Sequence, residues 1–565
     1  MFLRARNFVQ NTSERVRRRA LQAQQLCVFV LTGVAAHDHA GPAVVVSYLV
    51  AALAALLSGL AYCEFVVDQP VAGGAFNMVS STFGELAGWV VACNMILEYT
   101  LSVAAVARGF RAYGATLLGL SPDAGLLHAG PLQLDFSALA LVLALSAMLA
   151  ASTADSAAFN AVVTGMNLVV IAYILCAGLP FGRLENLAPF APSGARGVFG
   201  AASVVFFAFI GFDTVACAAE ETRNPARDLP IGIVGSLLAC SVLYAGLALT
   251  LCLMVPAPDI DMSAPFSTAF LAMVRPDSGA VRRLFLVTSA RFVSFGAVTG
   301  IVTSLLVSLL GQARIYVVLG REGLLPPSLA ELHTRRATPV RATWLTGASA
   351  GALALVADLE TLATMVSVGA LFVFLCVSAG VLWRRYRAPA PASCGVLAAQ
   401  LISICVLSLG TSLAFTLGAP PWAIAGLAGA WLAAVGGLAL RPVHFRPEKF
   451  RMPLSPLTPS AAILATVHLL GSLGWPAYAR FGGWMVLSVV VYCCYSVHGA
   501  DAHQRELAQA QRSSASEEDG DDEAARMNTA PRSDALELAA TKRPRAPPQD
   551  PPGGLGTYAV ADSED

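Results

Sequence analysis

Long stretches without a charged side chain dominate residues 41 to 500. A helix needs about 20 apolar residues to cross the hydrocarbon core of a membrane, and most of the stretches reach that length. The longest is divided in two by Pro420-Pro421, because proline interrupts a helix. The pattern predicts thirteen spans, in residues 41–63, 86–107, 136–154, 156–182, 197–219, 231–258, 292–313, 342–357, 361–383, 388–440 (two spans), 452–479 and 481–500. A further apolar piece, residues 26–36, is too short to span.

Charged residues are few, and their density is highest at the two ends of the chain. They make up 13% of the 565 residues, and 28 of the 72 lie in residues 1–22 and 499–565. A soluble protein carries about 25%. The chain is therefore predicted to be an all-α polytopic membrane protein. The chain has no basic patch with interleaved aromatic residues, so we expect no nucleic-acid binding. The cysteines form no Cys-x-x-Cys pair, so we expect no metal or cofactor, and we expect no enzymatic activity.

Arginine placement predicts the orientation. When the Arg-rich start, residues 1–22, is placed in the cytosol and the short apolar piece is counted as a crossing, the cytosolic loops contain 14 basic residues and the opposite loops nine. Basic residues favour the cytosolic side, so both termini are predicted to face the cytosol. Residues 501–565, with an acidic run from Glu517 to Glu523 and a Pro-rich end, have the composition of a disordered tail.

Two predicted spans carry an acidic residue. Glu98 lies about halfway along residues 86–107, and Asp213 follows Gly211-Phe212. A charge at the centre of a span costs at least about 2.5 to 3.5 kcal/mol, so each acid is a functional candidate. Either it is a buried, protonated carboxyl group bonded to a neighbouring helix, or it faces a water-filled cavity and accepts a proton or a cationic substrate. Glu64 lies near a span end, where a structural role is expected.

Gly211 interrupts an aromatic run and predicts a break in its helix, although it could instead be a packing notch. A break leaves backbone amides and carbonyls without helical partners. Inside a membrane such groups are tolerated only where they line a cavity or are buried in protein. Many secondary transporters bind zwitterions at broken helices of this kind.

The residues around this glycine closely resemble the cationic amino acid transporters, a family within the amino acid/polyamine/organocation superfamily. The similar segments are Phe-Phe-Ala-Phe-Ile-Gly-Phe-Asp-Thr-Val-Ala from Phe206, Ala-Glu-Glu-Thr-Arg-Asn-Pro-Ala-Arg-Asp-Leu-Pro-Ile-Gly-Ile-Val from Ala219, and residues 38–42, 70–74, 96–99, 106–108 and 323–326. The resemblance implies a LeuT-like core of two inverted five-helix repeats in residues 23–385, with four additional helices in 386–500. It also implies transport of arginine, lysine and ornithine by alternating access, across a plasma or vacuolar membrane.

The same resemblance implies a substrate site. Residues 206–211 become the unwound part of the sixth helix, and a small eighth-helix residue leaves room for an arginine or lysine side chain. Two acids lie closest to the cationic group. The implied substrate-binding residues are Phe207, Ala208, Ile210, Asp213, Ser308 and Glu98.

One residue of the predicted fifth helix indicates whether transport is coupled to protons. Asn167 aligns with a position where proton-coupled bacterial relatives have a lysine, and asparagine cannot titrate. Either the carrier is a uniporter driven by the substrate gradient and the membrane potential, or Glu98 handles the proton. A singly charged substrate gains about 2.3 kcal/mol per 100 mV on entering a negative interior. The expected partners are thus an amino acid, the bilayer and, in the second case, protons.

The beginning of the chain departs from the family pattern. The family's first helix has a Gly-x-Gly break whose amides hold the substrate carboxylate, but this chain has Gln25, Leu26 and Cys27 there. The first of the family's 14 spans is therefore truncated. A misassigned first exon, a degenerate carrier and a non-transporting amino acid sensor are three interpretations. A carrier of neutral or mixed amino acids is a further alternative.

Overall fold

The computed structural model describes residues 27–69, 73–121, 125–129, 132–151, 154–213, 222, 224–275, 279–333, 338–388 and 391–499. The predicted Arg-rich start and the predicted tail lie outside these residues, as do Gln25 and Leu26 of the position where the family has Gly-x-Gly.

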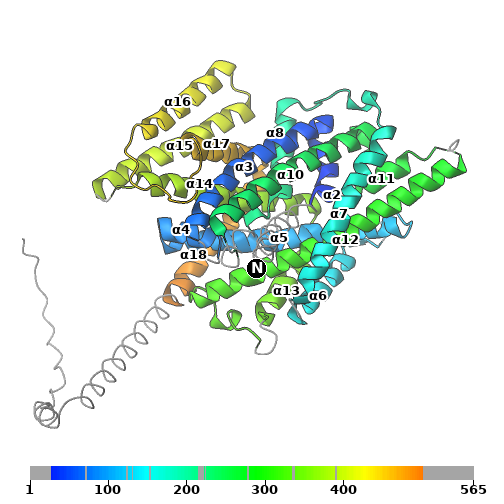
Figure 1. Cartoon of the computed structure of the whole chain (residues 1–565), viewed down its shortest axis with the longest axis horizontal. Coiled ribbons are helices and arrows are strands. Elements are labelled where there is room, and N and C mark those ends of the chain that lie inside the picture. The colour runs from blue at the N-terminus through cyan, green and yellow to red at the C-terminus, as the bar shows by residue number, and fades with distance from the viewer. Residues whose placement is uncertain are drawn as a thin grey trace, which may run out of the picture. The chain divides into compact units, whose positions relative to one another are not determined.

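The described residues are mainly helical (Figure 1). The α-helices are α2 (Cys27–Val34), α3 (Val44–Asp68), α4 (Ala75–Phe83), α5 (Glu85–Leu117), α6 (Phe136–Ala151), α7 (Ala154–Gly178), α8 (Gly194–Val205), α10 (Pro225–Met254), α11 (Pro265–Ala272), α12 (Ala280–Arg321), α13 (Val340–Val356), α14 (Leu359–Tyr386), α15 (Pro391–Leu417), α16 (Pro421–Ala439), α17 (Leu457–Gly471) and α18 (Trp475–Val491). Strands β1 (Leu127–Ala129) and β2 (Leu132–Leu134) pair antiparallel, with Leu127 opposite Leu134.

Short 3-10 and π segments accompany the helices. The π segments are η1 (Ala35–Ala40) and η9 (Tyr492–Ser496). The 3-10 segments are η2 (Gly41–Ala43), η3 (Leu179–Phe181), η4 (Leu184–Leu187), η5 (Phe206–Phe209), η7 (Ala257–Asp259) and η8 (Pro327–Leu329).

Each of the thirteen predicted spans has a helix in the structure, which confirms an all-α polytopic membrane protein. In the part of the chain that the structure describes, nine helical runs are long and apolar enough to cross a membrane, and four shorter apolar helices accompany them. The short helices α4 and α11 were not predicted, because eight or nine residues leave no long apolar run. The five-plus-five inverted repeat stays a prediction.

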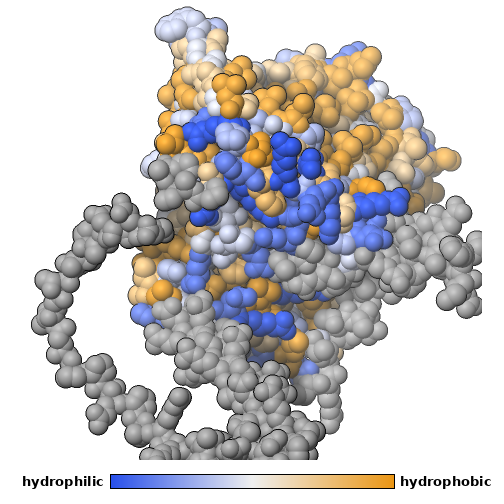
Figure 2. Space-filling view, turned by 60° about the vertical axis from the view of Figure 1, so that its left-hand side comes forward, coloured by the Kyte–Doolittle hydropathy of each residue, from blue (hydrophilic) through white to orange (hydrophobic). Residues whose placement is uncertain are grey.

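Burial separates the central helices from the peripheral ones. In the most apolar window of α5, 89% of the residues are buried, against 17% in α16 and 11% in the run from Trp475 to Gly499. A helix that is apolar on all sides and buried belongs to the interior, whereas an apolar and exposed one suits contact with lipid. Broad apolar areas are visible on the surface (Figure 2). Helix α5 therefore forms the centre, packed against α12 and α14.

Candidate functional site

The helix break predicted at Gly211 is present. Helix α8 ends at Val205, the 3-10 turn η5 follows, and Ile210 is extended with φ −67° and ψ 144°. Gly211 has φ +123°, a conformation that side-chain-bearing residues rarely adopt. The glycine is therefore required by the backbone of the break, and the alternative of a simple packing notch is not needed.

Asp213 holds the break together and ties it to α5. Its Oδ1 accepts a hydrogen bond from the Gly211 amide at 3.0 Å, and its Oδ2 accepts one from the Tyr99 hydroxyl at 2.9 Å. The side chain is buried. Hydrogen bonds to a carboxylate are stronger than neutral ones, so this acid fixes the position of the unwound segment relative to α5.

Glu98 is buried one residue before Tyr99 on α5. Its Oε1 has no hydrogen-bond partner in the described residues. A Cβ added to Gly369 of α14 would lie 3.9 Å from the Glu98 Cβ, so the two helices approach closely here. Asp213 lies near enough for the two acids to repel each other when both are ionised. Several buried polar atoms of the described residues lack a partner, and Glu98 is the acid among them, so it can receive a hydrogen-bond donor.

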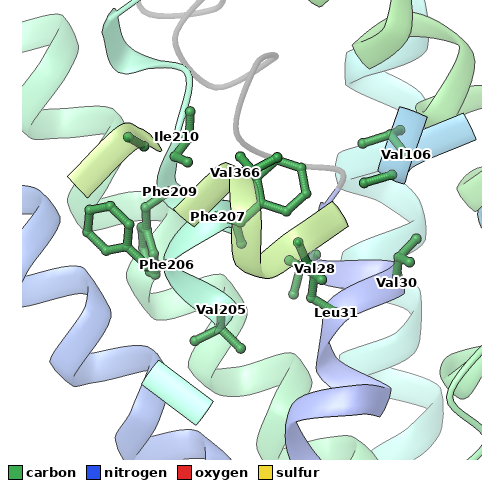
Figure 3. Packing of buried hydrophobic residues seen from close by; sticks show 14 of the residues in the cluster. Val28, Val30, Leu31, Val106, Val205, Phe206, Phe207, Phe209, Ile210 and Val366 are labelled. Atoms are coloured by element: carbon green, nitrogen blue, oxygen red, sulfur yellow. The ribbon is translucent and has the colours of Figure 1, made fainter. Parts of the chain in front are cut away.

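The carbonyls predicted to face a substrate lie in η5 and just after it. The Ile210 amide donates to the Phe207 carbonyl at 3.1 Å, which leaves that oxygen one further lone pair. Phe207, Ala208 and Ile210 are all buried. Figure 3 shows Val28 and Leu31 of α2 across from this segment, with Val366 of α14 nearby. Helix α2 therefore lies against the broken segment.

Helix α2 is built firmly into the interior. The Thr32 hydroxyl donates to the Val28 carbonyl at 2.6 Å and shares a hydrogen bond with the Tyr48 hydroxyl at 2.8 Å. The Tyr113 hydroxyl donates to the Phe29 carbonyl at 2.7 Å. These bonds connect α2 to α3 and α5, so the eight described residues of this helix are fixed in the interior.

The two remaining predicted residues lie on other helices. Ser308 is half-buried on α12, and Asn167 is buried on α7 with its Oδ1 lacking a hydrogen-bond partner in the described residues. Within the described part of the chain, neither makes a hydrogen bond to Glu98 or Asp213. The structure therefore brings together Glu98, Asp213 and the break, whereas Ser308 and Asn167 lie on other helices without a hydrogen bond to either acid.

Sequence reasoning missed two polar residues beside the acids. The Tyr99 ring packs against Gly311 of α12, where an added Cβ would lie 3.0 Å from the ring. The Gln312 amide nitrogen donates to the Thr100 hydroxyl at 2.6 Å and so joins α12 to α5. A glutamine inside an uncharged stretch was the available signal. No sequence feature indicated the hydrogen bond between Tyr99 and Asp213.

Comparison with known proteins places this architecture in a family. Residues 26–439 match the family model described as amino acid permease, and residues 450–500 match the model of the permease C-terminus. The chain is similar to cationic amino acid transporter 7, chloroplastic, of Arabidopsis thaliana, with 38% identity covering 84% of this chain and 82% of the relative. Cationic amino acid transporter 1 of the same plant is 36% identical, covering 87% and 83%.

A bacterial relative widens the range of similar proteins. The branched-chain amino acid permease BcaP of Bacillus subtilis is 30% identical, covering 83% of this chain and 89% of the relative. These matches, together with the apolar helices, describe a multi-pass membrane transporter of amino acids and not an enzyme. The chain belongs to the amino acid permease family.

Proposed function

We propose that the chain is a secondary transporter that moves cationic amino acids, such as arginine, lysine and ornithine, by alternating access. The observation that supports this specificity most directly is Glu98, whose buried Oε1 lacks a hydrogen-bond partner among the described residues beside a broken helix. A buried acceptor is costly when it stays unsatisfied. The guanidinium or ammonium group of a cationic substrate supplies the donor. The relatives named cationic amino acid transporters support the same specificity.

The break supplies the remaining contacts of the proposed site. The carbonyls of Phe207, Ala208 and Ile210 accept hydrogen bonds from the substrate ammonium group, while Ser308 leaves room for a long side chain. Asp213 contributes negative charge, and its hydrogen bonds with the Gly211 amide and the Tyr99 hydroxyl hold it beside the broken segment.

Driving force and location complete the proposal. Asn167 cannot carry a proton, so uptake is driven by the substrate gradient and the membrane potential, unless Glu98 acts as the proton acceptor. Both termini face the cytosol, as the arginine bias predicts. The carrier resides in a plasma or vacuolar membrane, and the relative named cationic amino acid transporter 8, vacuolar, supports the second location.

Two other functions make different predictions. A carrier of neutral or mixed amino acids is favoured by the similarity to the branched-chain permease, and leucine at equal concentration would then compete with arginine uptake. A non-transporting sensor is favoured by the departure at Gln25, Leu26 and Cys27, and it would bind arginine without flux.

The test is uptake of labelled arginine by the full chain in proteoliposomes, with and without leucine. The variants Glu98→Gln and Asp213→Asn each reduce uptake at least about tenfold, since hydrogen bonds to charged groups are worth about 1.5 to 3 kcal/mol. Glu331→Gln is the control, because Glu331 and its partner Arg341 form an exposed ion pair. Wild-type uptake in both acid variants would remove these residues from the site. Arginine binding without flux in the unmodified chain would favour the sensor.

A further inference from the structure

A buried ion pair joins the ends of two helices away from the acids of the site. The Arg385 Nε at the end of α14 donates to the Glu64 Oε1 near the end of α3 at 2.8 Å, and its Nη2 donates to Oε2. Both side chains are buried. Isolated buried charges are costly, and such a pair is tolerated only where further hydrogen bonds satisfy it.

The loop between α16 and α17, residues 440–456, supplies those bonds through Met452. The Met452 amide donates to the Glu64 Oε2 at 2.8 Å, and the Met452 carbonyl accepts from the Arg385 Nη2 at 3.4 Å. The backbone amides of His444 and Phe445 also donate to the backbone carbonyl of Arg385 at 2.9 and 3.2 Å. The loop therefore binds both members of the pair and connects both helix ends to a segment between the additional helices.

A second, more exposed pair reinforces the same junction. Arg384 pairs with Asp68, the last residue of α3. Its guanidinium lies 4.1 Å from the centre of the Phe445 ring and 5.6 Å from that of Phe65. A cation over an aromatic face is attracted by the electron-rich ring. Two arginines in succession thus hold α3, α14 and the loop together.

Aromatic packing connects this junction to the helix break. Tyr62, two residues before Glu64, has its ring centre 5.3 Å from that of Phe212 and 5.4 Å from that of Phe374 on α14. Phe374 in turn lies 5.0 Å from Phe212 and 5.8 Å from Phe206. A separation of α3 from α14 would therefore change the packing around the broken segment.

We propose that Glu64, Arg385 and the 440–456 loop form a latch that holds the predicted cytosolic ends of α3 and α14 together. The latch parts when the site opens towards the cytosol and closes when it opens to the opposite side. Its members are positioning residues, because they act on the site through Tyr62 and Phe374. This inference rests on the proposed alternating-access transport, since a sensor without flux has no need of such an opening.

The experiment measures arginine transport from each face of oriented proteoliposomes containing the full chain. In Glu64→Gln, the latch is weakened and the cytosol-open state gains population, so the apparent KM falls on the cytosolic face and rises on the other. We expect the ratio of the two KM values to change at least about fivefold, the lower end of typical coupling between sites. Asp68→Asn is the milder second variant and changes the ratio in the same direction. Glu331→Gln leaves it unchanged.

A transport-independent readout accompanies the kinetics. Trypsin cleaves after the exposed Lys449 and Arg451 of the loop, and Glu64→Gln is expected to speed this cleavage because the Met452 amide loses a charged acceptor. An unchanged KM ratio in both variants, with wild-type arginine flux, would overturn the latch alone. Absence of arginine flux in the unmodified chain would overturn the proposed function, and with it the role of the latch in transport.

Discussion

Replacing Tyr99 by phenylalanine isolates the bond that ties the helix break to α5. The change removes the hydroxyl that donates to the Asp213 Oδ2 at 2.9 Å and keeps the ring that packs against Gly311. The ring is retained, and the buried hydrogen bond to the carboxylate that is removed is worth about 1.5 to 3 kcal/mol. At 1.4 kcal/mol per factor of ten, arginine uptake at limiting concentration falls by about tenfold to a hundredfold.

The assay is the initial rate of labelled arginine uptake per molecule of folded protein in proteoliposomes. Tyr173→Phe is the matched control: its hydroxyl shares a hydrogen bond with that of Ser289 at 2.6 Å, between α7 and α12, and no carboxylate takes part. This control is expected to change uptake less than about threefold. Uptake by Tyr99→Phe within twofold of the unmodified chain would show that Asp213 does not need Tyr99 to position the break.

Two further substitutions test the break and the size of the site. Gly211→Ala forces a side chain into φ +123°, which costs more than about 1 kcal/mol. We therefore expect a lower melting temperature and lower arginine uptake. Unchanged values of both would contradict the need for glycine. Ser308→Met fills the space proposed for the long side chain of the substrate, so the KM for arginine rises about tenfold. The KM for alanine, if alanine is carried, changes little. Equal changes for both amino acids would contradict this role of Ser308.

The membrane spans and the helix break could be predicted from the sequence because each depends on residues that are close together in the chain. Apolar runs indicated the spans because a membrane helix must hide its own backbone, and Gly211 among aromatic residues indicated the break because the deviation is local. The contacts that give the site its geometry join distant residues. Tyr99 and Asp213 are 114 residues apart, and Glu64 and Arg385 are 321 apart. Nothing in the neighbouring sequence specifies such partners, so only the fold reveals them.

In the proposed site, the two acids have different roles because their oxygens make different hydrogen bonds. One carboxylate oxygen of Asp213 accepts a hydrogen bond from the Gly211 amide and the other accepts one from the Tyr99 hydroxyl, whereas the Glu98 Oε1 has no hydrogen-bond partner among the described residues. An arriving cation would both satisfy Glu98 and reduce its repulsion with Asp213, and a neutral side chain would do neither. Loss of the Glu98 charge should therefore reduce the preference for arginine over leucine more than it reduces leucine transport. Loss of the Asp213 charge should impair both substrates, because the break itself is disturbed.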